Sequence, residues 1–161
     1  MSDPVGYFLT WTCYGQWLHG DERGSVDRDH NTPGTPTLPP DPERAELAAR
    51  LMRYPPVVLD TAARALVTAT IRDHCRIRAW NLLAVNVRTN HVHVVVEYPG
   101  VKPEVILAQL KAWTTRRLRE ARLLPAGAHA WTREGSTGYL WKPSDVDAAV
   151  AYVMEAQDDR H

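Results

Sequence analysis

The order of strand-like and helix-like segments predicts an α+β fold, close to a ferredoxin-like split βαβ with an antiparallel sheet. Short runs rich in β-branched and aromatic residues are typical of strands. Longer segments between these runs repeat their apolar residues with helical periodicity. The sequence has no internal repeat, and its length predicts one domain over residues 1–161.

The first expected strand is the aromatic and β-branched run Tyr7–Tyr14, in which Trp11 is expected to pack in the core. A polar, proline-rich insertion follows at about residues 27–56. It is too long for a plain connection in a compact domain, so we expect it to be either functional or mobile. A short helix is expected within it, at about residues 42–52, because an aspartate followed by a proline is typical of a helix start.

Two long helices are expected, at residues 61–80 and 103–122. Residues 81–88, between them, alternate in polarity and predict a strand. This strand should pair antiparallel with the next one, because only Thr89-Asn90 separates the two. The expected buried stripes are Leu66, Ala69, Thr70, Asp73 and Ile77 on the first helix and Val105, Ile106, Leu110, Trp113, Thr114 and Leu118 on the second.

Toward the C-terminus, residues 129–142 surround a glycine-rich stretch, Gly135–Gly138, and predict a hairpin or a pair of short strands. The last helix is expected to begin at Ser144, because Ser144 and Asp147 resemble a capping box. Tyr152 lies about 110° from the centre of the apolar stripe of this helix. That stripe is expected to consist of Val146, Ala149, Val150 and Val153.

Composition and charge limit the function classes. The formal net charge is zero, so any surface that attracts nucleic acid must be local. No apolar run approaches the roughly 20 residues of a membrane span, and residues 1–4 do not resemble a signal peptide. Cys13 and Cys75 match no metal or redox spacing. We expect them to be reduced core residues of a cytoplasmic protein, with a single disulfide as the alternative.

The run Asn90–Glu97 is the most informative stretch. His91 and His93 should point to the same face of a buried strand, roughly 7 Å apart, while the valines between them anchor a core. Two imidazoles at that spacing can reach one divalent ion. No second His/Cys pair lies nearby, so the pattern favours Mg²⁺ or Mn²⁺ over zinc. A strand with two polar residues on a solvated face is the alternative.

The second long helix carries the densest basic patch of the chain. Either this face is simply solvated, or it makes phosphate contacts that add affinity without sequence specificity. In the loop after the first strand, stacking on a nucleobase competes with core packing as the role of Trp17.

His91-Val92-His93 resembles the HUH motif, and Tyr152 on a late helix resembles the tyrosine of the single-tyrosine members of that superfamily. The first strand and residues 14–25 resemble the start of REP-associated and insertion-sequence tyrosine transposases. The resemblance covers nearly the whole chain apart from the proline-rich insertion.

The resemblance implies a metal-dependent DNA transposase that nicks and rejoins single-stranded DNA. His91 and His93 would hold Mg²⁺ or Mn²⁺, and Tyr152 would attack the scissile phosphate to form a covalent 5′-phosphotyrosine link. It also implies a homodimer that recognises DNA hairpins, in a bacterial-type cytoplasm at the nucleoid and without a membrane partner. The candidate DNA contacts are Lys111, Arg116, Arg117 and Arg119, with Arg23, Trp17 and His19 as weaker ones.

One position departs from the family pattern. Relatives commonly carry glutamine or asparagine four residues after the tyrosine as a third metal ligand, but here that residue is Ala156. Glu155 lies about 60° from Tyr152 around the helix and is the better geometric candidate. Gln157 has the expected chemistry but lies about 140° away in a regular helix, and both stay candidates.

Two other functions remain open. One is a domesticated protein that binds a DNA hairpin without cutting it. The other is a histidine-triad-like nucleotide phosphohydrolase, which would want a third histidine at Val95.

Overall fold

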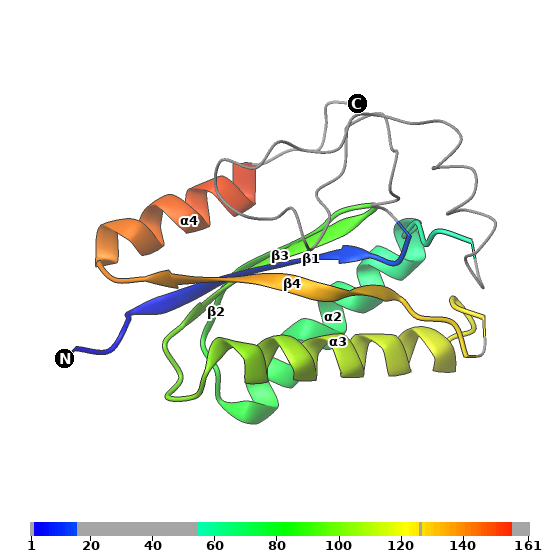
Figure 1. Cartoon of the computed structure of the whole chain (residues 1–161), viewed down its shortest axis with the longest axis horizontal. Helices are drawn as coiled ribbons and strands as arrows, with labels where there is room; N and C mark the ends of the chain where they lie inside the picture. The colour runs from blue at the N-terminus through cyan, green and yellow to red at the C-terminus, as the bar shows by residue number, and fades with distance from the viewer. Residues whose placement is uncertain (1, 16–54, 126, 156–161) are drawn as a thin grey trace, which may run out of the picture.

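The computed structural model describes residues 2–15, 55–125 and 127–155. These residues form a four-stranded antiparallel sheet with α2 and α3 on one face and α4 on the other (Figure 1), which confirms the predicted α+β fold. Most of the proline-rich insertion, with its expected short helix, lies outside the described residues. The elements are β1 (Gly6–Cys13), α2 (Thr61–Arg78), β2 (Leu82–Val87), β3 (His91–Glu97), α3 (Pro103–Glu120), β4 (Trp131–Leu140) and α4 (Pro143–Glu155).

The strand order is β2-β3-β1-β4, which is the order of a ferredoxin-like split βαβ sheet. The histidine strand β3 pairs antiparallel with β1 on one side and with β2 on the other. It is therefore a central strand, and Val92, Val94 and Val96 are fully buried on the face that α2 and α3 cover. The tight antiparallel pairing of β2 with β3 confirms the sequence prediction.

The main core lies between the sheet and the helices α2 and α3. Trp11 is 1% exposed and packs edge-on against Trp131, as its core assignment predicted. Cys13 and Cys75 are buried in the same core as free thiols. Within the described part of the chain, none of the helices combines the length and the apolar character needed to cross a bilayer.

The predicted buried stripe of α2 is largely wrong. Only Thr70 of that set is buried, and Ile77 is 70% exposed. The helix carries two overlapping apolar stripes, and packing against both the sheet and α3 selects the other one. The buried residues of α2 are Ala63, Val67, Thr70, Ile71, His74 and Cys75.

On α3 the predicted stripe is mostly confirmed, although Val105 and Trp113 lie at its edge and are partly exposed.

The expected hairpin at residues 129–142 is also wrong. Residues Trp131–Leu140 form one long edge strand that pairs with β1 along its length. These glycines lie within the strand rather than in a turn, and Gly135 is closely packed. A Cβ on Gly135 would meet the Thr10 carbonyl oxygen and a methyl group of Leu107 at 3.0 Å.

Helix α4 begins at Pro143, so the expected capping box from Ser144 does not form. A proline suits the first helical position because its missing N–H would have no helical partner there. The Asp145 carboxylate instead accepts hydrogen bonds from the backbone N–H groups of Trp141 (3.3 Å) and Lys142 (3.2 Å). The bond from Lys142 N–H to Asp145 matches the bond that the acidic residue of a capping box accepts from the N-cap N–H, at a different position from the expected one.

A second, smaller core holds α4 on the sheet. Val153 and Ala149 are buried against Val95 of β3 and Ala84 of β2. The Asn86 side chain adds a hydrogen bond from Nδ2 to the Val153 carbonyl, at 2.8 Å. The centre of the predicted stripe is thus confirmed, and these contacts fix the position of α4.

We expect Val153→Ala to lower the free energy of unfolding by about 1–3 kcal/mol, because it removes two buried methyl groups and leaves a cavity beneath α4. Urea denaturation measures the change. Met154→Ala is the matched control, since Met154 is 62% exposed and its loss should change stability little. Equal losses in the two variants would contradict the packing role of Val153.

Candidate active site

The two predicted histidines lie side by side on the sheet face that α4 covers. His91 is paired in register with Thr12 of β1, and His93 is paired with both Thr10 of β1 and Asn86 of β2. The centroids of the two imidazole rings are 4.7 Å apart, with the rings nearly perpendicular. His93 is only 8% exposed, so the pair is no ordinary solvated strand face.

Each imidazole uses Nδ1 for a hydrogen bond to a neighbouring side-chain oxygen. His91 Nδ1 lies 2.6 Å from Asn90 Oδ1, and His93 Nδ1 lies 2.9 Å from Thr10 Oγ1. With Nδ1 occupied in both rings, Nε2 is the nitrogen that each ring can offer to a ligand.

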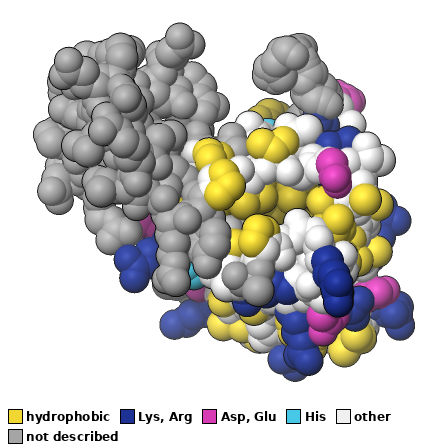
Figure 2. Space-filling model, turned by 90° about the vertical axis from the view of Figure 1, so that its right-hand side faces the viewer, with side chains coloured by type: hydrophobic (Ala, Val, Ile, Leu, Met, Phe, Trp, Pro, Cys, Tyr) yellow, Lys and Arg dark blue, Asp and Glu magenta, His cyan; other side chains and the backbone are white. Residues whose placement is uncertain are grey.

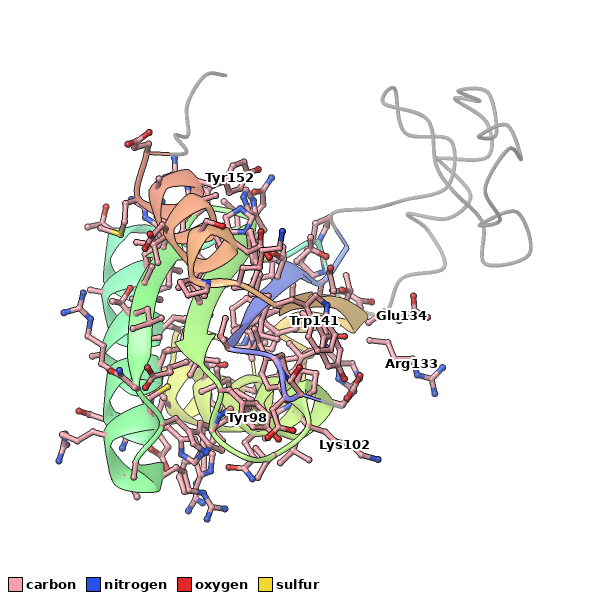
Figure 3. The ribbon with its side chains drawn as sticks, turned by 90° about the vertical axis from the view of Figure 1, so that its left-hand side faces the viewer. Tyr98, Lys102, Arg133, Glu134, Trp141 and Tyr152 are labelled. Carbon is pink, nitrogen blue, oxygen red and sulfur yellow. The ribbon has the colours of Figure 1, made fainter. Side chains whose placement is uncertain are left out.

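The structure places Tyr152 beside this pair within the same chain. Its ring centroid lies 5.7 Å from that of His93, and Phe8 touches both rings. Figure 3 shows Tyr152 on the side of α4 that is turned toward β1. The side chain is 57% exposed, so its hydroxyl can meet a substrate from solvent.

Both histidines are held neutral at pH 7. Burial lowers the pKa of His93 from 6.5 to about 4, with smaller contributions from the charges of His91 and Arg88. Burial, followed by the charge of Arg88, also lowers the pKa of His91. Neutral imidazoles are the form that binds metal ions, because a protonated ring has no free lone pair.

Arg88 and Asn86 belong to this cluster, although the sequence analysis missed them. The Arg88 guanidinium donates from Nη1 to Asn86 Oδ1 at 3.3 Å, and its backbone N–H donates to the His91 carbonyl at 2.7 Å. Asn86 and Arg88 alternate with Val85 and Val87 along β2 and the residue after it. This period-two placement of polar side chains was a signal that they share the face of the histidines.

The residues present fit a divalent ion that completes its shell with other oxygen ligands. Two neutral imidazoles point Nε2 away from their Nδ1 bonds, which suits Mn²⁺ or Mg²⁺ better than a four-ligand zinc site. Among the described residues, no cluster of three or more His, Cys, Asp or Glu could hold a metal. Glu155 is the exposed last residue of α4, and Gln157 lies outside the described residues.

The basic patch of α3 lies on the other face of the sheet. Figure 2 shows many Lys and Arg side chains in the lower part of the molecule, on the side that α2 and α3 cover. The structure therefore does not bring Lys111, Arg116, Arg117 or Arg119 to the histidines. Trp17, His19 and Arg23 lie outside the described residues.

Two of these cations, Lys111 and Arg119, donate hydrogen bonds to backbone carbonyls of the same chain. Lys111 Nζ donates to the backbone carbonyls of Thr132 (2.8 Å) and Arg133 (3.1 Å), and burial lowers its pKa. Arg119 Nη2 donates to the Ala128 carbonyl at 2.7 Å. Both therefore tie α3 to the segment that leads into β4 and to β4 itself.

Of the other two predicted cations, Arg116 is exposed and Arg117 is half-buried. The Arg116 guanidinium lies 5.0 Å from the ring centroid of Trp113 and also pairs with Glu120 at 3.3 Å, where both side chains are exposed. Arg117 lines a groove between α2 and α3, together with Arg78 and Trp113. These arginines carry charge that an anionic partner can reach.

A family model for IS200-like transposases matches residues 51–155. The chain belongs to the IS200-like transposase family. The match spans the histidine pair and ends at Glu155, the last residue of α4, which carries Tyr152.

Two solved structures share the fold. One is a REP-associated tyrosine transposase bound to a REP hairpin, with 13% identity and a TM-score of 0.52; the match covers 94% of this chain and 66% of that one. The other is a protein of Deinococcus radiodurans R1 assigned as a transposase, with 16% identity and a TM-score of 0.50, covering 96% and 92%. The IS200-like chain thus spans about two thirds of the length of the REP-associated protein. No protein with a curated description matches it by sequence.

We expect the metal-free protein to lose stability as the pH falls from about 6.5 toward 4. In that range the unfolded chain protonates His93 and the folded chain does not, so the unfolded state binds more protons and acid favours it. Urea denaturation in the presence of a chelator, at pH 7 and pH 4.5, measures the loss. His93→Gln should show a smaller loss than the wild type. An equal loss in both proteins would contradict the low pKa of His93.

Proposed function

We propose that this chain is a metal-dependent transposase that nicks and rejoins single-stranded DNA through a covalent 5′-phosphotyrosine intermediate. One observation carries the proposal: the Tyr152 ring lies 5.7 Å from the ring of His93, in a cluster whose two histidines are neutral and offer Nε2. A hydroxyl nucleophile next to a site for a divalent ion is the arrangement that phosphoryl transfer needs.

The two histidines and Tyr152 have different roles in this reaction. His91 and His93 would hold the ion through Nε2, and the ion would supply Lewis-acid polarisation of the scissile phosphate. The Tyr152 hydroxyl gives up its proton and its oxygen forms a bond to phosphorus, while the bond from phosphorus to the 3′ oxygen breaks. The leaving oxygen takes up a proton and becomes a 3′-hydroxyl. Attack by another 3′-hydroxyl reverses these steps, so rejoining needs no ATP.

Arg88 suits an electrostatic role in the same step. Its guanidinium lies close enough to both imidazoles to lower the pKa of each. Burial lowers the pKa of Arg88 itself, but a guanidinium stays protonated at neutral pH. A fixed cation beside the reacting phosphate stabilises the negative charge that spreads over the phosphate oxygens. We include Arg88 among the residues proposed to contact the scissile phosphate.

Hairpin-bearing DNA is the proposed partner. The REP-associated neighbour is bound to a REP hairpin, and its fold is shared. The surface arginines Arg116 and Arg117 would contact DNA phosphates on the α2–α3 face. Because Tyr152 lies beside the histidines of its own chain, we propose that it acts with them. The homodimer stays a prediction.

The histidine-triad alternative is less favoured by the packing. Val95, where a third histidine would stand, is fully buried against α4 in the smaller core. A histidine there could not reach a substrate without displacing the helix that carries Tyr152.

We expect Tyr152→Phe to abolish the covalent protein–DNA adduct, because the ring remains and only the attacking oxygen is lost. The assay incubates protein with hairpin-bearing single-stranded DNA and Mn²⁺ and detects the adduct by denaturing gel. Tyr139→Phe is the control, since Tyr139 is also half-exposed but stands on the other face of the sheet. An adduct that survives Tyr152→Phe would exclude this mechanism. Tight hairpin binding without cleavage by the wild type would support the domesticated alternative instead.

We expect the double variant Arg116→Ala, Arg117→Ala to bind hairpin DNA more weakly and with a shallower salt dependence. Removing two phosphate contacts lowers the slope of log affinity against log salt by about two. Fluorescence anisotropy at several salt concentrations measures both quantities. Lys102→Ala with Lys142→Ala is the control of equal charge, because both lysines are exposed and lie outside this patch. The same slope in both double variants would argue against the α2–α3 face as a DNA contact.

A further inference from the structure

We infer that Asn90 and Thr10 are positioning residues that set the proton arrangement of the histidine pair, so that both rings present a bare Nε2 to a divalent ion. Asn90 imposes this arrangement on His91, whereas Thr10 allows it in His93. The inference rests on the proposed metal-dependent function. It assigns a role to two side chains that the proposed reaction does not use directly.

The argument for Asn90 follows from its chemistry. A side-chain amide oxygen only accepts hydrogen bonds, so the 2.6 Å contact with Asn90 Oδ1 places the hydrogen on His91 Nδ1. A neutral imidazole has a single N–H, so a hydrogen on Nδ1 leaves none on Nε2. His91 Nε2 therefore carries a lone pair even before any ion binds.

The argument for Thr10 is different, because a hydroxyl can donate or accept. The 2.9 Å contact between Thr10 Oγ1 and His93 Nδ1 is therefore compatible with either tautomer of His93. An ion at Nε2 requires the hydrogen on Nδ1, and Thr10 can accept it without any movement. The tautomer of His91 is thus fixed before the ion binds, while the Nδ1–H tautomer of His93 is selected when the ion binds.

The sheet holds both oxygens rigidly. Asn90 uses its backbone carbonyl to accept from the Cys13 N–H at 2.9 Å, and Thr10 lies within the register that pairs β1 with β3. Partners that fix the orientation of metal-binding histidines typically change metal affinity by 10- to 100-fold when removed. Thr12, the next residue on the same face, bonds to Thr132 Oγ1 at 3.0 Å and supplies a natural control.

The experiment reads the tautomers directly. Long-range ¹H–¹⁵N NMR of the metal-free full chain at pH 7 distinguishes imidazole Nδ1–H from Nε2–H in each ring. We expect His91 as the Nδ1–H tautomer in the wild type and in Asn90→Asp, which keeps an acceptor oxygen. In Asn90→Ala we expect a shift of His91 toward Nε2–H. A wild-type His91 that carries its hydrogen on Nε2 would overturn the inference.

Metal affinity provides the second readout. Titration with Mn²⁺ should give a Kd about 10-fold or more above the wild-type value for Asn90→Ala and for Thr10→Val. Asn90→Asp and Thr10→Ser should restore binding, and Thr12→Val should leave Kd unchanged. The same NMR spectra serve as the control that each variant is folded. Unchanged Mn²⁺ affinity in Asn90→Ala and Thr10→Val, or no Mn²⁺ binding by the wild type, would overturn the inference.

The adduct assay separates this inference from the proposed function. If the tautomers and Mn²⁺ affinities follow expectation but the wild type forms no covalent adduct, the positioning role stands and the nuclease function fails. If the adduct forms with unaltered efficiency at limiting Mn²⁺ in Asn90→Ala and Thr10→Val, the function stands and the positioning role fails.

Discussion

The pairing of β3 on both sides is the constraint on which the rest of the structure depends. Because β3 is a central strand, its side chains divide strictly between two faces. Val92, Val94 and Val96 fill the main core under α2 and α3. His91 and His93 are thereby directed to the opposite face, where β1 and β2 supply polar neighbours and α4 supplies a tyrosine.

The position of Tyr152 depends on a small number of contacts. Two apolar side chains of α4, Ala149 and Val153, pack on Val95 and Ala84. Asn86 of β2 donates to the Val153 carbonyl and accepts from the Arg88 guanidinium, so this one side chain contacts both α4 and the cation beside the histidine pair. The fold and the site are joined at this residue.

Much of the fold follows from local sequence, and the predictions that were wrong have physical causes. The strand at Asn90–Glu97 and the role of Trp11 follow from alternation and composition, and the off-stripe tyrosine follows from helical angles. The glycines of β4 looked like a turn because sequence alone does not show that Gly135 must admit the Thr10 carbonyl. The stripe of α2 depended on which neighbours the helix meets, which no local pattern records.

The sequence predicted the central residues of the candidate site but not the residues that contact them. The motif predicted His91, His93 and Tyr152, which the structure brings together, but it did not predict the side-chain contacts of Asn90 with His91, of Thr10 with His93 and of Arg88 with Asn86. The basic character of α3 is evident from its sequence, yet the side of the sheet on which it lies and the bonds of Lys111 and Arg119 to backbone carbonyls depend on tertiary packing. Residue type alone does not distinguish a cation that holds a backbone carbonyl from one that faces solvent.

The exposure of Tyr152 bears on how a target would be chosen. Tyr152 is 57% exposed on its helix, so the described residues around it do not form a closed pocket for a nucleobase. Chemistry at such a position would tolerate many bases at the cut. Discrimination between DNA sequences would then fall to surfaces remote from the tyrosine, and new target preferences could evolve there without disturbing the reacting groups.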